Sequence, residues 1–218
     1  MFILVTGPTR SGKSEWAEEI TYRLFSELLN RRNDERNDDL NHQLAVDQKV
    51  VNPILDSLQL DHNQPSVELI YIATASHNPD DLEWTARITE HQQRRCAPWQ
   101  TREVPQALSQ TLNGLNSNQV VLVDALGTWL ANFLELDDQA WQTIETELIT
   151  AVGNCQATLI CVAEEVGWSV VPAYALGRTF RDRLGRLVRQ LAGIADQTYL
   201  VVAGFALDLR QLGTRVSS

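Results

Sequence analysis

The sequence predicts an α/β protein with a mostly parallel, doubly wound sheet and helices on both faces. Short apolar, β-branched runs alternate along the chain with stretches of helical periodicity, and such alternation favours parallel strands joined by helical crossovers. Most links between these segments are short. The first unit is a strand, a glycine-bounded turn and a helix. At 218 residues the chain fits one domain with its own core.

The turn of that first unit has the spacing of a phosphate-binding loop, G-x-x-x-x-G-K-[ST]. Backbone N–H groups at the start of the helix would surround phosphate oxygens, Lys13 would neutralise the β- and γ-phosphates, and the Ser14 hydroxyl would hold Mg²⁺. A chance match is disfavoured because both flanking elements fit. The sequence therefore predicts a P-loop NTPase-like fold. The expected phosphate-binding residues are Gly7, Pro8, Thr9, Arg10, Ser11, Gly12, Lys13 and Ser14.

The helix after the loop is expected to end near Asn30. Apolar residues recur in it at every fourth position, which predicts a buried stripe: Trp16, Ile20, Leu24 and Leu28. From about 30 to 66 the chain is polar and charged, contains two prolines and has no sustained period. We interpret that segment as a partly disordered surface insertion in a single nucleotide-binding domain spanning residues 1–218.

The remaining elements follow from periodicity and from turn residues. Besides the first strand at Met1–Val5, strands are expected at Val67–Ala75, Trp99–Val104, Gln119–Asp124, Ala157–Ala163 and Thr198–Ala203, the last of which should close the sheet. A helix should begin at Asn78–Asp81, where Asn can cap and Pro79 fits the first helical position. Further helices are expected near Gln106–Leu115, Thr128–Leu134, Gln139–Val152 and Ala173–Ala195.

Composition excludes several classes of partner. The net charge of -10 argues against nucleic acid, which needs a basic face. Three cysteines without metal-ligand spacing fit a reducing cytoplasm. No apolar run is long enough to span a bilayer. We therefore expect a soluble, cytoplasmic protein with no transmembrane segment.

Asp124 follows four apolar residues at the end of an expected strand. A carboxylate there can bind Mg²⁺ directly or through water, as the second half of a nucleotide site. Beside the phosphate loop, this interpretation is favoured over that of an ordinary strand-end acid.

Arg87, His91 and Arg95 are spaced by four residues and would share one face of the second helix. Flanking guanidinium groups disfavour the protonated imidazole and attract nucleotide phosphates. That combination suits a nucleophile for a nucleotide's phosphorus atom. From the residues alone, however, a solvated face with an incidental histidine is favoured.

Two further groups stay open between two interpretations. The arginines of 178–189 form either a solvated face or the lining of a phosphate pocket. Glu164 and Glu165 follow a strand near the expected ligand crevice, so they either contact a substrate hydroxyl or are ordinary loop acids.

Taken together, these stretches resemble the bifunctional adenosylcobinamide kinase / adenosylcobinamide-phosphate guanylyltransferase family of cobalamin biosynthesis. The resemblance covers nearly all of the chain outside the insertion, in the correct order. Its signatures are R-S-G-K-S, R-I-x-x-H and E-V-G-x-x-x-V-P, with L-I-Y-I-A-T-A and V-L-V-D-A-L-G-T-W-L-A-N between them. Glu164 stands where the family often has asparagine.

The resemblance implies two reactions. ATP or GTP would phosphorylate the aminopropanol hydroxyl of adenosylcobinamide, with Mg²⁺ at Ser14 and Asp124. His91 would then attack the α-phosphorus of GTP, and the resulting GMP-histidine would pass GMP to adenosylcobinamide phosphate, giving adenosylcobinamide-GDP. A homo-oligomer, a homotrimer, is also implied. Besides the loop and Arg87, nucleotide contacts carry over to Ala73, Thr74, Ala75, Gln92, Gln93, Arg94, Arg95, Glu103 and Asp124.

Two alternatives remain at this point. A P-loop small-molecule kinase without guanylyltransferase activity would use the same loop, with His91 only contacting phosphate or serving the structure. A nucleotide-dependent regulatory or scaffolding protein would use the arginine-rich helix as a partner surface. The lack of an extended repeat or coiled coil in the sequence speaks against the latter.

Overall fold

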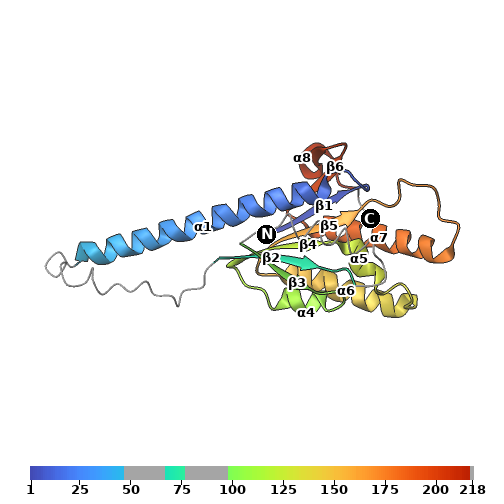
Figure 1. The fold of residues 1–218 in the computed structure, drawn as a ribbon, viewed down its shortest axis with the longest axis horizontal. Helices are drawn as coiled ribbons and strands as arrows, with labels where there is room; N and C mark the ends of the chain where they lie inside the picture. The colour runs from blue at the N-terminus through green and yellow to red at the C-terminus, as the bar shows by residue number, and fades with distance from the viewer. Residues whose placement is uncertain (47–66, 77–97, 217–218) are drawn as a thin grey trace.

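A computed structural model of the chain describes residues 1–46, 67–76 and 98–216, with the side chains of 35–46 left out. These residues build one seven-stranded sheet with the strand order β3-β2-β4-β5-β1-β6-β7 (Figure 1). The strands are β1 (Phe2–Gly7), β2 (Glu68–Ala73), β3 (Trp99–Glu103), β4 (Gln119–Asp124), β5 (Thr158–Glu164), β6 (Gln197–Val202) and β7 (Phe205–Asp208). The first six pair in parallel, so the prediction of a mostly parallel sheet is confirmed.

The seventh strand corrects one expectation. Thr198–Ala203 was expected to close the sheet, but β7 pairs antiparallel with β6 and forms the edge. Only Ala203 and Gly204 connect the two strands, with φ values of 50° and 78°. A two-residue turn with both φ angles positive matches the twist of a hairpin. The four-residue β7 has no long apolar pattern, so sequence periodicity did not reveal it.

Helices cover both faces of the sheet, as predicted. The helix α1 (Lys13–Val46) lies on one face, and α4, α5, α6 and α7 pack on the other (Figure 1). Their bounds are α4 (Leu108–Asn113), α5 (Leu126–Ala131), α6 (Asp138–Asn154) and α7 (Ala175–Ile194), and a single turn, α8 (Leu209–Leu212), follows β7. The helix expected to start at Asn78 lies outside the described residues.

The helix α1 is longer than the sequence led us to expect. The sequence predicts an end near Asn30, yet α1 continues to Val46 and projects beyond the sheet (Figure 1). The apolar stripe does stop near Leu28, but no glycine or proline occurs between Gly12 and Pro53, so nothing in the backbone chemistry ends the helix. Helical charge pairs such as Glu27–Arg31, at 3.9 Å, give it modest local support. The segment expected to be irregular is thus helical over 31–46, and residues 47–66 lie outside the described part.

Alternate residues of each central strand enter two separate cores, because strand side chains point to opposite faces. In β1, Ile3 and Val5 pack toward α1, while Phe2 and Leu4 pack toward α5 and α7. The core on the face covered by α4 to α7 is the larger one and contains Trp129 and Trp141, whose ring centroids are 5.9 Å apart.

The parallel arrangement places the carboxyl ends of β1 to β6 at one edge of the sheet. Gly7, Ala73, Glu103, Asp124 and Glu164 are the last residues of their strands. Open α/β sheets bind ligands at this edge, so it is the part of the fold in which a site is expected.

We predict that Trp129→Ala lowers the free energy of unfolding by about 3–5 kcal/mol, since it removes a fully buried ring and leaves a cavity. Denaturant titration measures this change. Leu212→Ala is the control, because Leu212 is 72% exposed and such substitutions change stability by about 0.5 kcal/mol or less. Equal losses in both variants would contradict the assignment of Trp129 to the core.

Candidate active site

The phosphate loop connects the end of β1 directly to the start of α1. Arg10 and Gly12 adopt φ values of 58° and 93°, which turn the backbone back toward the helix. The amide of Trp16 donates to the Gly12 carbonyl over 2.9 Å, which sets the first helical turn. The first N–H groups of a helix have no partner within it, so they are available for an anion here.

Close packing against the neighbouring strand requires the first glycine of the loop. A Cβ atom on Gly7 would collide with the carbonyl oxygen of Val201 in β6. The turn after β6 also holds the loop, because the Gly204 amide donates to the Ser11 carbonyl over 3.1 Å. The loop backbone is therefore fixed from the side of β6 before any ligand binds.

Two side chains of the loop have polar atoms that bear on anion binding. The Lys13 ammonium donates to the Pro8 carbonyl at 3.5 Å, so it folds back over the loop. The Ser11 hydroxyl oxygen is buried and has no hydrogen-bond partner among the described residues. A buried polar atom without a partner is costly, and a phosphate oxygen in the loop is a suitable partner. The described loop thus fits a phosphate group.

Glu164 brings a carboxylate to the loop from β5. Glu164 pairs with Gly7 in the β1–β5 register, and its Oε2 accepts a hydrogen bond from the Gly127 amide over 3.0 Å. Burial raises the pKa of Glu164, the Lys13 ammonium lowers it and the Asp124 carboxylate raises it. Lys13, Asp124 and Glu164 therefore interact as one electrostatic cluster.

The start of α5 is shaped around this carboxylate. A Cβ on Gly127 would collide with the carboxylate of Glu164, so a larger residue at this position would displace that carboxylate. The hydrogen bond from Gly127 also places a negative charge at the amino end of α5, which the helix dipole favours.

Glu165 ties the following loop to the phosphate loop. The Glu165 amide donates to the Gly7 carbonyl over 2.9 Å, and its Oε1 accepts from the Thr6 hydroxyl over 2.7 Å. Thr6 is the next-to-last residue of β1 and is buried. These two contacts fix where the chain leaves β5.

Asp124 lies on the next strand of the edge. Its Oδ2 accepts a hydrogen bond from the Tyr71 hydroxyl over 3.1 Å, which orients the carboxylate from β2. Among the described residues, no group of three or more His, Cys, Asp or Glu could hold a metal ion. Magnesium bound together with phosphates needs only one or two carboxylates. Ser14, Asp124 and Glu164 supply oxygen donors of that kind, so the donor chemistry fits Mg²⁺.

Thr74, an expected nucleotide contact, serves the backbone after β4. Its hydroxyl lies 2.6 Å from the Ala125 carbonyl oxygen and 2.6 Å from the Thr128 hydroxyl. The Asn132 side chain in turn donates to the Thr74 carbonyl over 3.1 Å. These bonds fix the turn into α5.

The structure brings only part of the expected set together. Glu164 interacts electrostatically with both Lys13 of the loop and Asp124. Ala73 and Glu103 end β2 and β3, three and four positions from β1 in the strand order, or about 14 and 19 Å at ~4.8 Å per strand. Several expected residues lie outside the described part of the chain: Arg87, His91, Gln92, Gln93, Arg94 and Arg95.

The arginines of α7 differ in their surroundings. The buried Arg183 donates to the Phe133 and Leu136 carbonyls at 3.2 and 2.7 Å and lies over the Trp141 ring, so its role is structural. Arg186 and Arg189 are exposed. These contacts favour packing and solvation over a phosphate pocket for these three arginines.

Sequence reasoning left Glu164 and Glu165 open and did not identify Thr6, Tyr71 or Gly127. The signal that could have found them was register. Both acids follow a strand that would lie beside the first one, and parallel neighbours end together. Hydrogen bonds between strands, however, depend on strand order, which the sequence did not give.

Comparisons of the sequence with a family model and with curated proteins point to one family. Residues 58–209 match the model of the family described as cobinamide kinase / cobinamide phosphate guanyltransferase. A bifunctional adenosylcobalamin biosynthesis protein CobU from Escherichia coli is 32% identical over 96% of this chain and 100% of its own, and its Salmonella typhimurium counterpart is 30% identical over the same shares. CobP from Pseudomonas aeruginosa is 37% identical over 64% of this chain and 81% of its own.

Among solved structures, a KaiC-like protein from Pyrococcus horikoshii covers 91% of this chain and 71% of its own, at a TM-score of 0.35 and 12% identity. This likeness is too low to support a functional argument. Among the helices that the structure describes, none combines the length and apolar character needed to cross a membrane.

We predict that Glu164→Gln makes stability less dependent on pH. The folded-state pKa of Glu164 is raised above its ordinary value of 4.5, so the wild type loses stability as pH rises from about 4.5 through that raised pKa. Glutamine does not titrate and keeps an acceptor for the Gly127 amide. Denaturant titrations without nucleotide or magnesium should therefore show the variant gaining relative to the wild type with rising pH. A difference that is constant with pH would contradict the buried carboxylate.

Proposed function

Since the chain belongs to the cobinamide kinase / cobinamide phosphate guanyltransferase family, we propose that its phosphate loop holds the nucleotide for the reactions of that family. The enzyme is a kinase and nucleotidyltransferase of cobalamin biosynthesis. The observation that carries the assignment to residues is the cluster of Lys13, Glu164 and Asp124 beside a loop with an unpaired buried hydroxyl. Such a cluster can hold the phosphates and a cation next to them.

In the kinase reaction, the aminopropanol hydroxyl of adenosylcobinamide attacks the γ-phosphorus of ATP or GTP. The bond from that phosphorus to the β–γ bridging oxygen breaks, the nucleoside diphosphate leaves, and the hydroxyl proton is released to water. Lys13 and the N–H groups at the start of α1 stabilise the charge on the phosphate oxygens. Ser14 and Asp124 would hold Mg²⁺, which supplies further neutralisation of that charge when bound.

Glu164 acts in this proposal by positioning its neighbours. Its carboxylate accepts a hydrogen bond from the Gly127 amide and is attracted electrostatically by the Lys13 ammonium. It therefore holds the start of α5 by a direct contact and favours the ammonium in the loop through its charge. Because the family often carries asparagine at this position, the chemistry itself does not depend on a carboxylate there.

In the guanylyltransferase reaction, an imidazole nitrogen of His91 attacks the α-phosphorus of GTP and pyrophosphate leaves. A phosphate oxygen of adenosylcobinamide phosphate then attacks the same phosphorus, the P–N bond breaks, and adenosylcobinamide-GDP forms. The support for His91 is its sequence pattern, in which Arg87 and Arg95 flank it at helical spacing. The same arginines, with Gln92, Gln93 and Arg94, would bind the nucleotide.

The proposal extends to Ala73, Thr74, Ala75 and Glu103 as more distant nucleotide contacts along the same sheet edge. The protein is further proposed to act in the cytoplasm and to form a homotrimer, as the family resemblance implies. Sedimentation of the full chain measures the oligomeric state.

We predict that Lys13→Ala lowers kcat/KM of the kinase reaction about a hundredfold or more, because it removes a preorganised charge from the transferred phosphates. Phosphorylation of cobinamide by labelled ATP or GTP measures this. The matched control is Lys49→Ala, which changes the chain's other lysine and should keep wild-type rates. Full activity in Lys13→Ala would rule out the phosphate-loop assignment.

We predict that GTP labelled at the α-phosphate transfers label to the protein, and that this label is acid-labile, as expected of a phosphorus–nitrogen bond. His91→Ala should abolish the label, whereas His62→Ala should retain it. Label that persists in His91→Ala would place the nucleophile elsewhere. No label in the wild type would contradict the covalent intermediate.

A further inference from the structure

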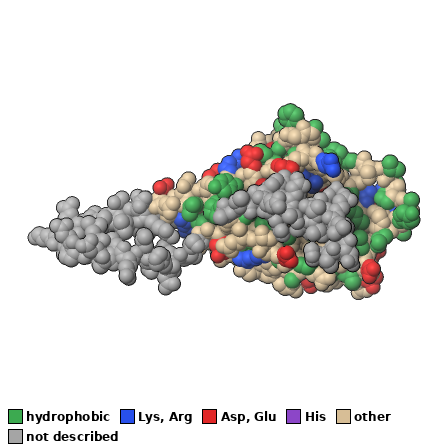
Figure 2. Space-filling view, viewed as in Figure 1, with side chains coloured by type: hydrophobic (Ala, Val, Ile, Leu, Met, Phe, Trp, Pro, Cys, Tyr) green, Lys and Arg blue, Asp and Glu red, His purple; other side chains and the backbone are tan. Residues whose placement is uncertain are grey.

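The loop between β5 and α7 carries an unusual concentration of exposed apolar side chains. Trp168, Val170, Val171 and Tyr174 are 59%, 89%, 62% and 83% exposed, and Leu176 in the first turn of α7 is 53% exposed. Figure 2 shows hydrophobic side chains gathered at the end of the molecule where this loop and the start of α7 lie. Residues 166–177 include no charged residue, in a chain of net charge -10. Contiguous exposed apolar surface of this kind marks a binding site.

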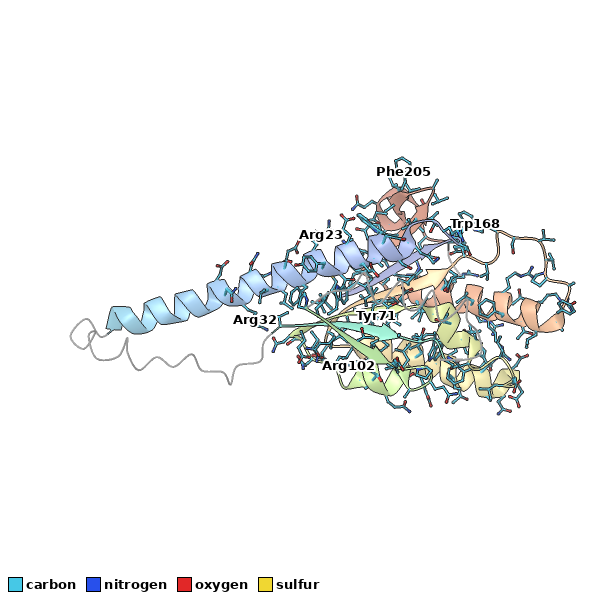
Figure 3. All side chains as sticks on the ribbon, in the orientation of Figure 1. Arg23, Arg32, Tyr71, Arg102, Trp168 and Phe205 are labelled. Carbon is cyan, nitrogen blue, oxygen red and sulfur yellow. The ribbon has the colours of Figure 1, made fainter. Side chains whose placement is uncertain are left out.

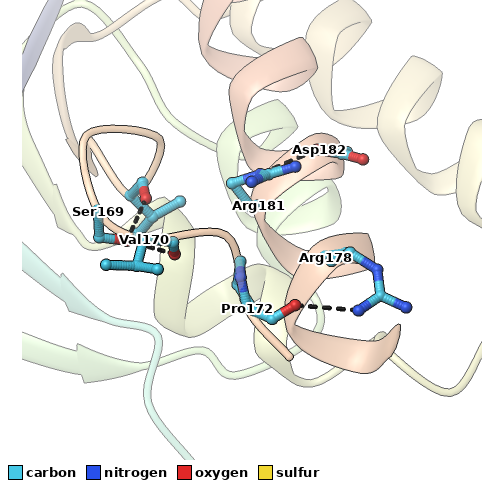
Figure 4. A network of polar contacts seen from close by, with 7 residues as sticks. Ser169, Val170, Pro172, Arg178, Arg181 and Asp182 are labelled. Atoms are coloured by element: carbon cyan, nitrogen blue, oxygen red, sulfur yellow. Dashed lines mark hydrogen bonds and ion pairs between the residues drawn. The ribbon is translucent and has the colours of Figure 1, made fainter. Parts of the chain in front are cut away.

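The loop is held in place at both ends. Its first end follows Glu165, which is hydrogen-bonded to Gly7 and Thr6 of β1. At its second end, the Arg178 guanidinium donates to the Pro172 and Ala173 carbonyls at 3.0 and 2.7 Å (Figure 4). Inside the loop, the Ser169 hydroxyl lies 3.1 Å from the Val166 carbonyl oxygen. The apolar side chains are thus presented outward on a fixed backbone, which lowers the entropic cost of binding.

The same contacts bring the apolar surface near the reacting phosphates. Trp168 follows Glu165 by three residues, a span of at most about 11 Å, and the Glu165 amide is 2.9 Å from the Gly7 carbonyl. Figure 3 places Trp168 near the end of β1, apart from the exposed Phe205 of β7. A ligand that contacts Trp168 therefore lies beside the nucleotide that the phosphate loop would hold.

We propose that Trp168, Val170, Val171 and Tyr174 form the docking surface for the corrinoid substrate, an inference that rests on the proposed function. A corrinoid is a large ring with apolar faces and amide side chains at its rim. Aromatic rings offer such a ligand flat apolar contact, and the Trp Nε1–H and the Tyr hydroxyl can bond its amides. An uncharged surface is unsuited to a second nucleotide, which needs cationic groups. The corrinoid's hydroxyl must also reach the phosphorus at the loop, and this surface adjoins it.

The test compares Trp168→Ala and Tyr174→Ala with the wild-type full chain. We expect the KM for cobinamide in the kinase reaction to rise about tenfold or more in each variant, as for loss of an aromatic contact at the centre of a binding surface. The KM for the nucleotide and the self-labelling by GTP should not change. Tyr22→Ala is the matched control, because Tyr22 is 51% exposed on α1 and should leave all of these values as in the wild type. Trp168→Phe should recover most of the affinity.

Three results would overturn the proposal. The first is an unchanged KM for cobinamide in both loop variants. The second is a sedimentation mass that changes in the loop variants while the KM for cobinamide does not, which would make the loop a contact between copies of the chain.

The third result concerns the case in which the wild type does not phosphorylate cobinamide at all, so that the proposed function fails. Binding is then measured directly by the quenching of tryptophan fluorescence with cobinamide, and binding that is equal in the wild type and Tyr174→Ala overturns the docking surface independently.

Discussion

The position of β1 between β5 and β6 is the constraint on which the rest of the site depends. Parallel pairing on both sides fixes Gly7 against Glu164 in one neighbour and places it in contact with Val201 in the other. The contact with Val201 is so close that no side chain fits at Gly7, and the turn after β6 holds the Ser11 carbonyl. The phosphate loop is therefore rigid because of its neighbours, and a rigid set of N–H groups needs no reorganisation when charge develops on a phosphate.

The electrostatic balance at this edge follows from the same pairing. Glu164 is partly buried, which disfavours its charge, and Asp124 adds repulsion, while Lys13 opposes both effects. Without a ligand, the ammonium is the group that makes two carboxylates tolerable in one place. In the proposed site, a cation at Asp124 and phosphates at Lys13 would add to this balance of charges.

Much of this fold could be predicted from the sequence, and the failures have physical causes. The central strands were predicted because buried strands are continuous apolar runs, and the predicted bounds of Gln119–Asp124 are those of β4 in the structure. The edge strand β3 is a largely exposed, polar segment, WQTRE, so this reason does not apply to it. The predicted end of α1 was wrong because the apolar stripe stops before the helix does. Burial determines how far the apolar stripe extends, whereas helix propensity and the absence of helix-breaking residues determine how far the helical backbone extends. The strand β7 was missed because a four-residue hairpin arm depends on its turn and on β6 more than on its own residues. Within the site, the turn between the first strand and the first helix lies where the sequence predicts it, and phosphate binding there stays a prediction. The contacts of Glu164, Glu165 and Tyr71 were not predicted, since each joins elements that are separate in the sequence.

By itself, the sequence determined the phosphate loop, the alternation of strands and helices, and the family, because these depend on local spacing and on residue order. His91 and its arginines also remain a prediction from sequence, as they lie outside the described residues. Tertiary structure alone decided that Glu164 interacts electrostatically with Lys13, that Arg183 is a buried structural group, and that an uncharged apolar loop leaves the sheet beside Gly7. The reason is that strand order, register and helix packing bring together residues far apart in the sequence, and no local pattern encodes which elements become neighbours.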